Sequence, residues 1–120
     1  MIQYNKQSGG ALYDLSKLKK IGSEDFVKKM LQIFIKEVPP SATLIKVAYD
    51  GRDFATVKYL THRIRPSIQN MGIEQLYNEV NEIENLADIE EASPMLERMI
   101  EKLETITHQV AEKVKAEYNL

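Results

Sequence analysis

Apolar residues recur every three or four positions along most of the chain, the spacing that places them on one face of an α-helix. The first such segment, residues 14–22, predicts a short helix that is capped by its aspartate and stopped by its glycine. A long helix is predicted to begin at the capping residue Ser23 and to end at Asp50–Gly51. Pro39–Pro40 lies inside it and predicts a kink or a break, because proline has no backbone N–H to donate. The residues expected to face the core here are Leu15, Leu18, Ile21, Phe26, Met30, Ile33, Phe34, Leu44, Val47 and Ala48.

Three further helices follow with clear boundary signals. Asp53 is predicted to cap the first of them, and Gly72 is predicted to close it. Residues 76–87 are predicted to form the next helix. Ser93–Pro94 marks the start of the last one, because a capping residue followed by proline is typical of a helix N-terminus. The stripes expected to face inward are Phe54, Val57, Thr61, Ile64, Ile68 and Met71, then Leu76, Val80, Ile83 and Ala87, then Leu96, Met99, Leu103, Ile106, Val110 and Val114.

The loops between the long helices are short, so consecutive helices are expected to be antiparallel neighbours. No segment alternates apolar and polar residues as a strand does, and no internal repeat is present. The sequence therefore predicts an all-α fold, an up-and-down antiparallel four-helix bundle with an extra short N-terminal helix that covers one end. Residues 1–11 are expected to form a flexible leader, and residues 12–120 the bundle domain. Because four amphipathic helices can bury one another's stripes, we expect a monomer.

The composition fits a globular domain, since 43% of the 120 residues are hydrophobic and 28% are charged. The net charge of −2 gives no reason to expect nucleic acid binding, and the absence of cysteine excludes disulfide and thiolate chemistry. No apolar run approaches the roughly 20 residues that span a bilayer, and the first residues do not form a secretory signal, so a cytoplasmic protein is expected. No Glu-x-x-His pair and no glycine-rich phosphate loop occurs, so neither a metal centre nor another cofactor is expected.

Two histidines remain as candidates for chemistry. His108 has Glu104 and Glu112 one turn away on either side, and we interpret it as a solvated surface residue. His62 directly follows Thr61 of the inward stripe, which places it about 100° around the helix, toward water. An exposed imidazole in this position is accessible to another molecule.

The face of the predicted helix around His62 is basic. Lys58, Arg65 and Gln69 share this face with His62 at spacings of three and four residues. Spacing alone explains them equally well as the solvated side of an amphipathic helix. Pro66 weighs against that explanation, because proline inside a helix costs about 3 kcal/mol and removes the N–H that would bond the His62 carbonyl. A helix defect tolerated beside the histidine favours a functional role.

The segment from His62 to Gly72 resembles the active helix of histidine-containing phosphotransfer (HPt) domains. The family pattern has a histidine, an aliphatic residue two later, a basic residue three later, a small residue often followed by serine, and a closing aliphatic residue and glycine. Those places are occupied here by Ile64, Arg65, Ser67, Met71 and Gly72. The family usually has lysine at the place of Arg65 and glycine at the place of Pro66. Residues 13–34 also resemble the family's entry into its bundle.

The resemblance implies a phosphocarrier in a two-component phosphorelay, with His62 as the phosphoacceptor. Its implied partners are receiver domains of response regulators or hybrid histidine kinases, whose aspartates exchange the phosphoryl group and whose pocket supplies Mg²⁺ and acidic groups. No general base is visible around His62, which fits a carrier rather than a complete enzyme. Arg65 is expected to support the phosphoryl group or the histidine. Further supporting residues are expected to be Lys58, Pro66, Ser67 and Gln69. The partner is expected to dock on exposed apolar groups, for which Tyr59 and Ile73 are the candidates.

Two other functions remain open. The segment from His62 to Pro66 is also similar to the phosphoacceptor helix of the sensor kinase dimerisation domain. There, however, the proline falls five residues after the histidine, and a second copy completes the bundle. The chain could instead be a helical adaptor or inhibitor that binds a partner by one face, with an idle histidine.

Overall fold

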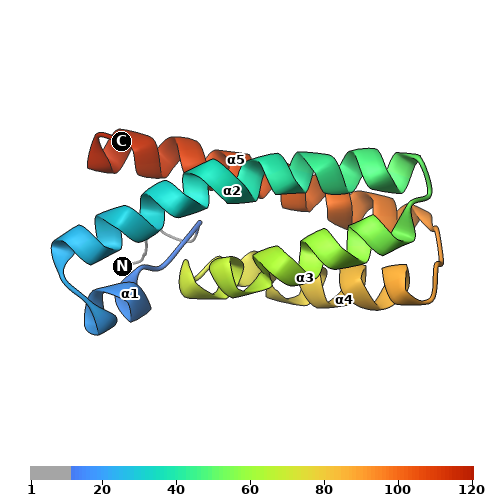
Figure 1. The fold of residues 1–120 in the computed structure, drawn as a ribbon, viewed down its shortest axis with the longest axis horizontal. Helices are drawn as coiled ribbons and strands as arrows, with labels where there is room; N and C mark the ends of the chain where they lie inside the picture. The colour runs from blue at the N-terminus through green and yellow to red at the C-terminus, as the bar shows by residue number, and fades with distance from the viewer. Residues whose placement is uncertain (1–11) are drawn as a thin grey trace, which may run out of the picture.

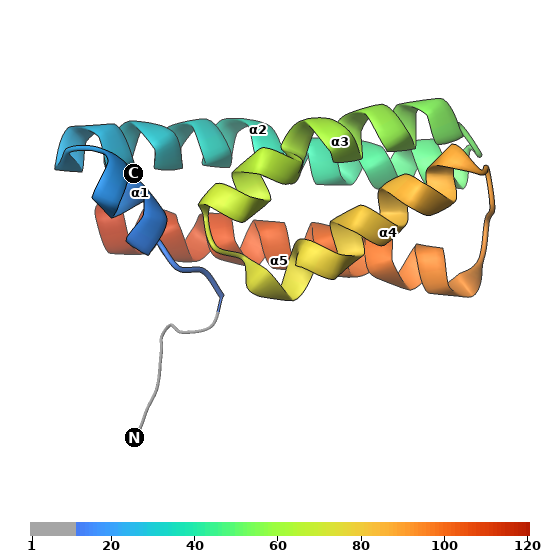
Figure 2. The same cartoon turned by 90° about the horizontal axis from the view of Figure 1, so that it is seen from below.

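The computed structural model describes residues 12–120, and the elements of this part of the chain are all helical. They are α1 (Ser16–Ile21), α2 (Glu24–Asp50), α3 (Phe54–Asn70), the 3-10 turn η1 (Glu74–Leu76), α4 (Tyr77–Asp88) and α5 (Pro94–Tyr118). The four long helices run alternately up and down, and α5 packs back on α2 to close the bundle (Figures 1 and 2). This is the predicted antiparallel four-helix bundle with a short extra helix. The expected flexible leader, residues 1–11, lies outside the described residues.

The core is one apolar layer between the four long helices, formed where the predicted stripes meet. The stripes of α3, α4 and α5 are confirmed, because all their predicted residues are buried except Phe54, Met99 and Ile106, which pack against the core while partly exposed. Burial of one such aliphatic side chain stabilises a fold by about 1.5–3 kcal/mol, so this layer is the main source of stability. Within residues 12–120, none of the helices has the length and apolar composition needed to cross a membrane.

The buried face of α2 differs from the predicted one by about one residue. Its buried hydrophobic residues are Val27, Leu31, Phe34, Val38, Ala42, Ile45 and Tyr49. Ile33, Leu44 and Val47 were expected in the core but are exposed, and so is Ile21 of α1. The helix carries two neighbouring apolar stripes, and its packing against α3 and α5 decides which one is buried. Spacing within the helix alone does not distinguish them.

The helix α2 continues through Pro39–Pro40, so of the predicted kink or break, the break is wrong (Figure 1). Val38 and Ala42, which flank the prolines, are almost completely buried, and the ring of Pro39 is buried as well. This packing holds the turn in a helical conformation although the prolines leave two carbonyls one turn earlier without helical N–H partners. Tertiary contacts therefore outweigh the local cost of the prolines.

Capping residues fix the starts of α2, α3 and α5 as predicted. The side chains of Ser23, Asp53 and Ser93 each accept a hydrogen bond from the backbone N–H three residues later, at 3.1, 3.1 and 3.0 Å. The hydroxyl of Tyr49 donates to the carbonyl of Ser93 at 3.1 Å and so ties the end of α2 to the start of α5. These local bonds fix where the helices start and hence which residues of α3 lie beside α4.

Gly72 closes α3 with a φ of +62°, a backbone conformation that favours glycine. The chain near Asp14 crosses this turn, and the Asp14 N–H donates to the carbonyl of Met71 at 3.0 Å. A Cβ atom on Gly72 would collide with the carbonyl oxygen of Asp14. Leu15 and Leu18 then enter the core, so the segment around α1 covers this end of the bundle as expected.

We expect Gly72→Ala to lower the free energy of unfolding by about 1–3 kcal/mol, because alanine is strained at this φ and its methyl group meets Asp14. Gly51→Ala is the matched control, since Gly51 has a φ of −87° and its added Cβ would have no neighbour closer than 3.8 Å. The control is expected to leave stability nearly unchanged. Chemical denaturation followed by circular dichroism measures both variants. Equal stability of Gly72→Ala and the wild type would contradict the close crossing.

Candidate functional site

His62 lies in the middle of α3 on the side turned away from the core. Its neighbours Thr61 and Ile64 are buried, whereas its own side chain is 67% exposed. The imidazole lines an open hollow at the surface of α3 and α4. The other residues that line this hollow are Ala55, Lys58, Tyr59 and Glu84. The imidazole therefore faces water, as the helical spacing predicts, and a second protein can reach it.

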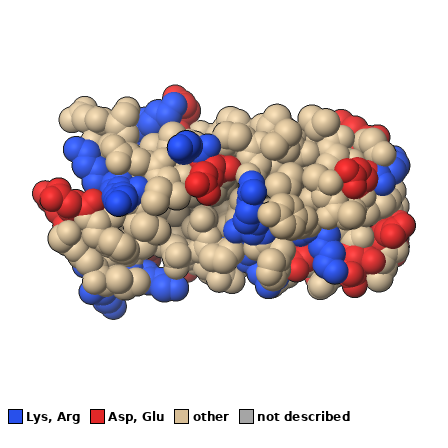
Figure 3. Space-filling model, viewed as in Figure 1, with Lys and Arg blue, Asp and Glu red and all other residues tan. Residues whose placement is uncertain are grey.

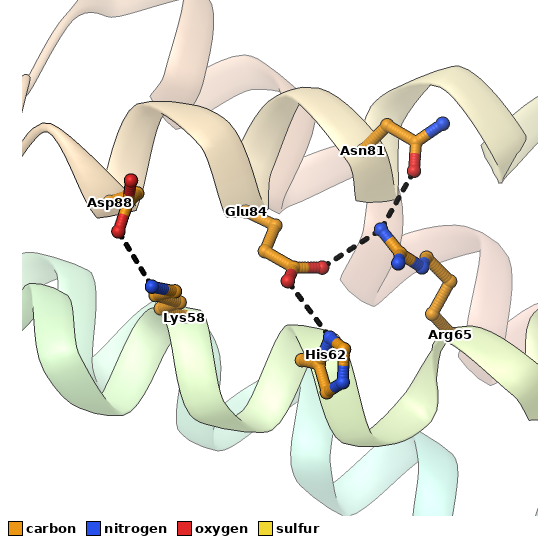
Figure 4. Close-up of polar contacts among 6 residues, drawn as sticks. All are labelled: Lys58, His62, Arg65, Asn81, Glu84 and Asp88. Carbon is orange, nitrogen blue, oxygen red and sulfur yellow. Dashed lines mark hydrogen bonds and ion pairs between the residues drawn. The ribbon is translucent and has the colours of Figure 1, made fainter.

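A carboxylate from α4 holds one nitrogen of the imidazole. Nδ1 of His62 lies 2.8 Å from Oε2 of Glu84, whose side chain is only 16% exposed (Figure 4). Because an ionised carboxylate can only accept a hydrogen bond, this contact favours the imidazole tautomer that has its proton on Nδ1. The second ring nitrogen, Nε2, points away from Glu84 (Figure 4). No general base is visible around His62 in the sequence of α3, but the fold brings the Glu84 carboxylate of α4 beside it.

Arg65 binds the other side of the same carboxylate. Its Nη1 donates to Oε1 of Glu84 at 2.9 Å and to Oδ1 of Asn81 at 2.9 Å. Each oxygen of Glu84 therefore has its own partner, His62 on one and Arg65 on the other (Figure 4). Charge-assisted hydrogen bonds of this kind fix the orientation of a carboxylate more firmly than neutral ones. Arg65 and His62 thus contact the same carboxylate.

Lys58, one turn before His62, is also paired with a carboxylate of α4. Its Nζ lies 2.6 Å from Oδ1 of Asp88, and this hydrogen bond raises the pKa of Lys58 above its ordinary value. The sequence alone presents His62 between two unpaired cations. In the structure, the charge of each cation is offset by an acidic residue of α4, so the basic face expected from α3 is close to neutral.

These contacts follow from the antiparallel packing of α3 against α4. Residue numbers along α3 rise by three or four as those of the facing α4 residues fall by three or four. The facing pairs are Lys58 with Asp88, His62 with Glu84, and Arg65 with Asn81. The acidic residues flank the buried stripe of α4 at helical spacing, which is the signal by which the sequence could have identified them. To predict which acidic residue faces which residue of α3, one also needs the register between the two helices.

The remaining predicted supporting residues, Pro66, Ser67 and Gln69, differ from one another in exposure. Pro66 is exposed on α3, which continues through it to Asn70. Ser67 is partly buried, Gln69 is exposed, and the carbonyl of Gln69 accepts a hydrogen bond from the hydroxyl of Tyr77 at 3.3 Å.

The two candidate docking residues differ in exposure to solvent. Tyr59 is 62% exposed and lines the hollow beside His62. Ile73 is completely buried, so its expected role as an exposed docking group is wrong. The turn after Gly72 directs Ile73 into the core beneath η1 rather than along the outer face of α3, because α3 has already ended there.

His108 has a different environment from His62. Its Nδ1 lies 2.8 Å from the backbone carbonyl of Glu104 one turn earlier on α5, which is an ordinary contact for an exposed helical histidine. The Glu112 carboxylate pairs with Lys115 at 3.0 Å instead. In residues 12–120, no group of three or more His, Asp or Glu side chains is arranged to hold a metal ion.

The geometry at His62 suits a nucleophile. An imidazole that carries its proton on Nδ1 has its lone pair on Nε2, and here Nε2 points away from Glu84 on a side chain that is 67% exposed. Such a nitrogen can attack an electrophile presented by another molecule, and the adjacent carboxylate stabilises the positive charge that forms on the ring.

Comparison with known proteins gives one family. The family model described as Hpt domain matches residues 29–113, more than half of the chain, and the match includes the whole of α3 and α4. Neither the curated proteins nor the solved structures contain a match.

Proposed function

Because the chain belongs to the Hpt domain family, whose members carry phosphoryl groups on histidine in phosphorelays, we propose that His62 is its phosphoacceptor. The observation that carries the proposal is the placement of its ring: Nδ1 lies 2.8 Å from Glu84 Oε2, Nε2 points away from Glu84, and the side chain is 67% exposed. His62 accepts the phosphoryl group from the aspartate of one receiver domain and donates it to the aspartate of another. The chain acts as a carrier, and the chemistry of transfer is shared with the partner.

The proposed partner supplies what the surface around His62 lacks. Phosphoryl transfer depends on positioning and on neutralising the charge of the transferred group, mostly by metal ions and cations. The receiver domain is proposed to bring Mg²⁺ and its own acidic pocket to the exposed imidazole. A monomeric bundle suits this arrangement, because each copy then presents one accessible histidine.

The docking surface is proposed to extend from His62 over Tyr59. Tyr59 projects beside the histidine, and its ring is backed by the guanidinium of Arg63, whose Cζ lies 5.7 Å from the ring centroid. Arg63 is held in turn by a hydrogen bond of 3.0 Å to the hydroxyl of Ser41 on α2. In the view of Figure 3, a broad area over α2 carries no charged groups. Exposed apolar surface beside a reactive group lets a partner exclude water from the transfer.

We expect His62→Gln to abolish labelling of the protein by a phosphorylated receiver domain in the presence of Mg²⁺. The label on the wild type should be acid-labile and base-stable, as a bond between phosphorus and nitrogen is. His108→Gln is the control and should leave labelling intact. Both substitutions should change the melting temperature little, because exposed positions contribute little packing. Undiminished acid-labile labelling of His62→Gln would overturn the assignment, and a wild type that no receiver domain labels would favour a helical adaptor.

We expect Arg65→Ala to slow phosphoryl transfer more than Lys58→Ala. Arg65 anchors the carboxylate that holds His62, whereas Lys58 contacts only Asp88. Loss of a hydrogen bond to a charged group corresponds to about a tenfold change in rate. Rapid-quench measurements of transfer from a phosphorylated receiver domain compare the variants, with melting curves to verify folding. Equal, negligible effects of the two substitutions would remove Arg65 from the site.

We expect Tyr59→Ala to weaken binding of a receiver domain by about tenfold, the typical cost of truncating an aromatic group in an interface. Ile21→Ala is the control, since Ile21 is similarly exposed at 63% but lies on α1 rather than on α3 or α4. Isothermal titration with a response regulator measures both dissociation constants. If the control weakens binding as much as Tyr59→Ala, the partner does not dock over the His62 face.

A further inference from the structure

Pro66 leaves a backbone acceptor free beside the imidazole of His62. In an α-helix the carbonyl of each residue accepts from the N–H four residues later, and the residue at that position for His62 is Pro66, which has no N–H. We propose that the carbonyl oxygen of His62 is a second contact point of the site, which accepts a hydrogen bond from an N–H donor of the docked receiver domain. This inference rests on the proposed function, because it names a contact that positions the partner on the same histidine.

The free carbonyl lies on the outer face of α3. The side chains of His62 and Pro66 are both exposed, whereas Ile64 and Ile68 on the opposite side of the helix are buried. A helical carbonyl points along the axis toward the residue four positions later, so this oxygen lies between two exposed side chains. A donor of another protein can therefore reach it from the side on which the imidazole is exposed.

No side chain in residues 12–120 takes the place of the missing N–H. The two guanidinium groups that follow His62 in sequence have other acceptors. Arg63 donates to the hydroxyl of Ser41 at 3.0 Å, and Arg65 donates to Asn81 and Glu84 at 2.9 Å. The backbone N–H groups on either side of the gap belong, by the helical pattern, to the carbonyls of neighbouring residues. The acceptor is thus left to water or to a partner.

The chain provides a matched control in Pro40. This proline also lies inside a long helix with its side chain exposed, and it leaves the carbonyl of Lys36 without a helical N–H partner. Pro40→Ala and Pro66→Ala therefore make the same change in two helices, since each restores one backbone N–H. They differ in place, because only Pro66 frees an acceptor next to His62. A purely structural role for Pro66 predicts the same consequences for both substitutions.

The first measurement needs no partner. Amide hydrogen exchange followed by NMR reports whether the N–H that Pro66→Ala introduces is hydrogen-bonded. We expect this N–H to exchange slowly, because the carbonyl of His62 is free to accept it within the helix. Exchange at the rate of an unprotected amide would show that the carbonyl is not available in the helical direction, and it would overturn the inference.

The second measurement is the affinity for a receiver domain, determined by isothermal titration, with melting curves to verify folding. We expect Pro66→Ala to weaken binding about three- to tenfold, the effect of one hydrogen bond, because the new N–H occupies the acceptor. Pro40→Ala should leave the affinity unchanged. A Pro66→Ala variant made with an ester oxygen in place of the new N–H should recover the wild-type affinity, because the carbonyl of His62 is free again.

Titration at about 0.05 and 0.5 M salt identifies the kind of donor, because salt screens exposed charges. A loss of affinity that shrinks at high salt assigns the donor to a charged side chain of the partner, and a loss independent of salt assigns it to a backbone N–H. Unchanged affinity of Pro66→Ala, an equal loss in Pro40→Ala, or an ester variant as weak as Pro66→Ala itself would overturn the inference while the proposed function stands. A wild type that no receiver domain phosphorylates would overturn the proposed function and with it this partner, whereas hydrogen exchange would still decide whether the carbonyl is free.

Discussion

The antiparallel packing of α3 on α4 determines what the surface around the histidine can do. The buried stripes of the two helices, which include Val57 and Ile64 on α3 and Val80 and Ile83 on α4, belong to one core and fix the register between the helices. Once this register is set, the polar residues beside the stripes face each other in a fixed order. The imidazole then lies opposite a carboxylate rather than opposite water alone. The surroundings of His62 are therefore a consequence of how the core packs.

This pairing changes the electrostatic account of the site. On α3 alone, His62 lies between two cations, which suggests a positively charged surface prepared for phosphate. In the bundle, those cations are bound to carboxylates of α4, and the groups that remain at the surface are close to neutral in sum. Under the proposed function, the charge of an incoming phosphoryl group would therefore be neutralised mainly by the partner and its metal ion. Such a surface would suit transfer in either direction.

Much of the fold follows from the sequence because its signals are local. Ser23, Asp53 and Ser93 were predicted as caps from their own side chains and the residues that follow, and each forms the expected bond. The inward faces of α3, α4 and α5 were predicted because each of these helices has one dominant stripe. The face of α2 was predicted wrongly, since Leu44 and Val47 lie on a second stripe of similar spacing.

Only the part of the site that lies on α3 could be predicted, because sequence signals are local to one helix. The position of His62 on α3, its exposure and the proximity of Arg65 depend on spacing within one helix, and the structure agrees with them. Glu84 was missed because it belongs to another helix, and its distance from His62 depends on the register between α3 and α4. Ile73 was misplaced because the turn at Gly72 ends α3, so periodicity could not be extended beyond it.

The proposed function places the phosphoryl group on Nε2 of His62. Phosphorus–proton correlation NMR of the protein, phosphorylated by a receiver domain, tests it most directly. A phosphorus atom on Nε2 is three bonds from both carbon-bound protons of the ring, whereas one on Nδ1 is three bonds from Hε1 only. The account predicts one phosphorus signal that correlates with both ring protons of His62. Correlation with Hε1 alone, a signal on His108, or the absence of a phosphohistidine signal would contradict it.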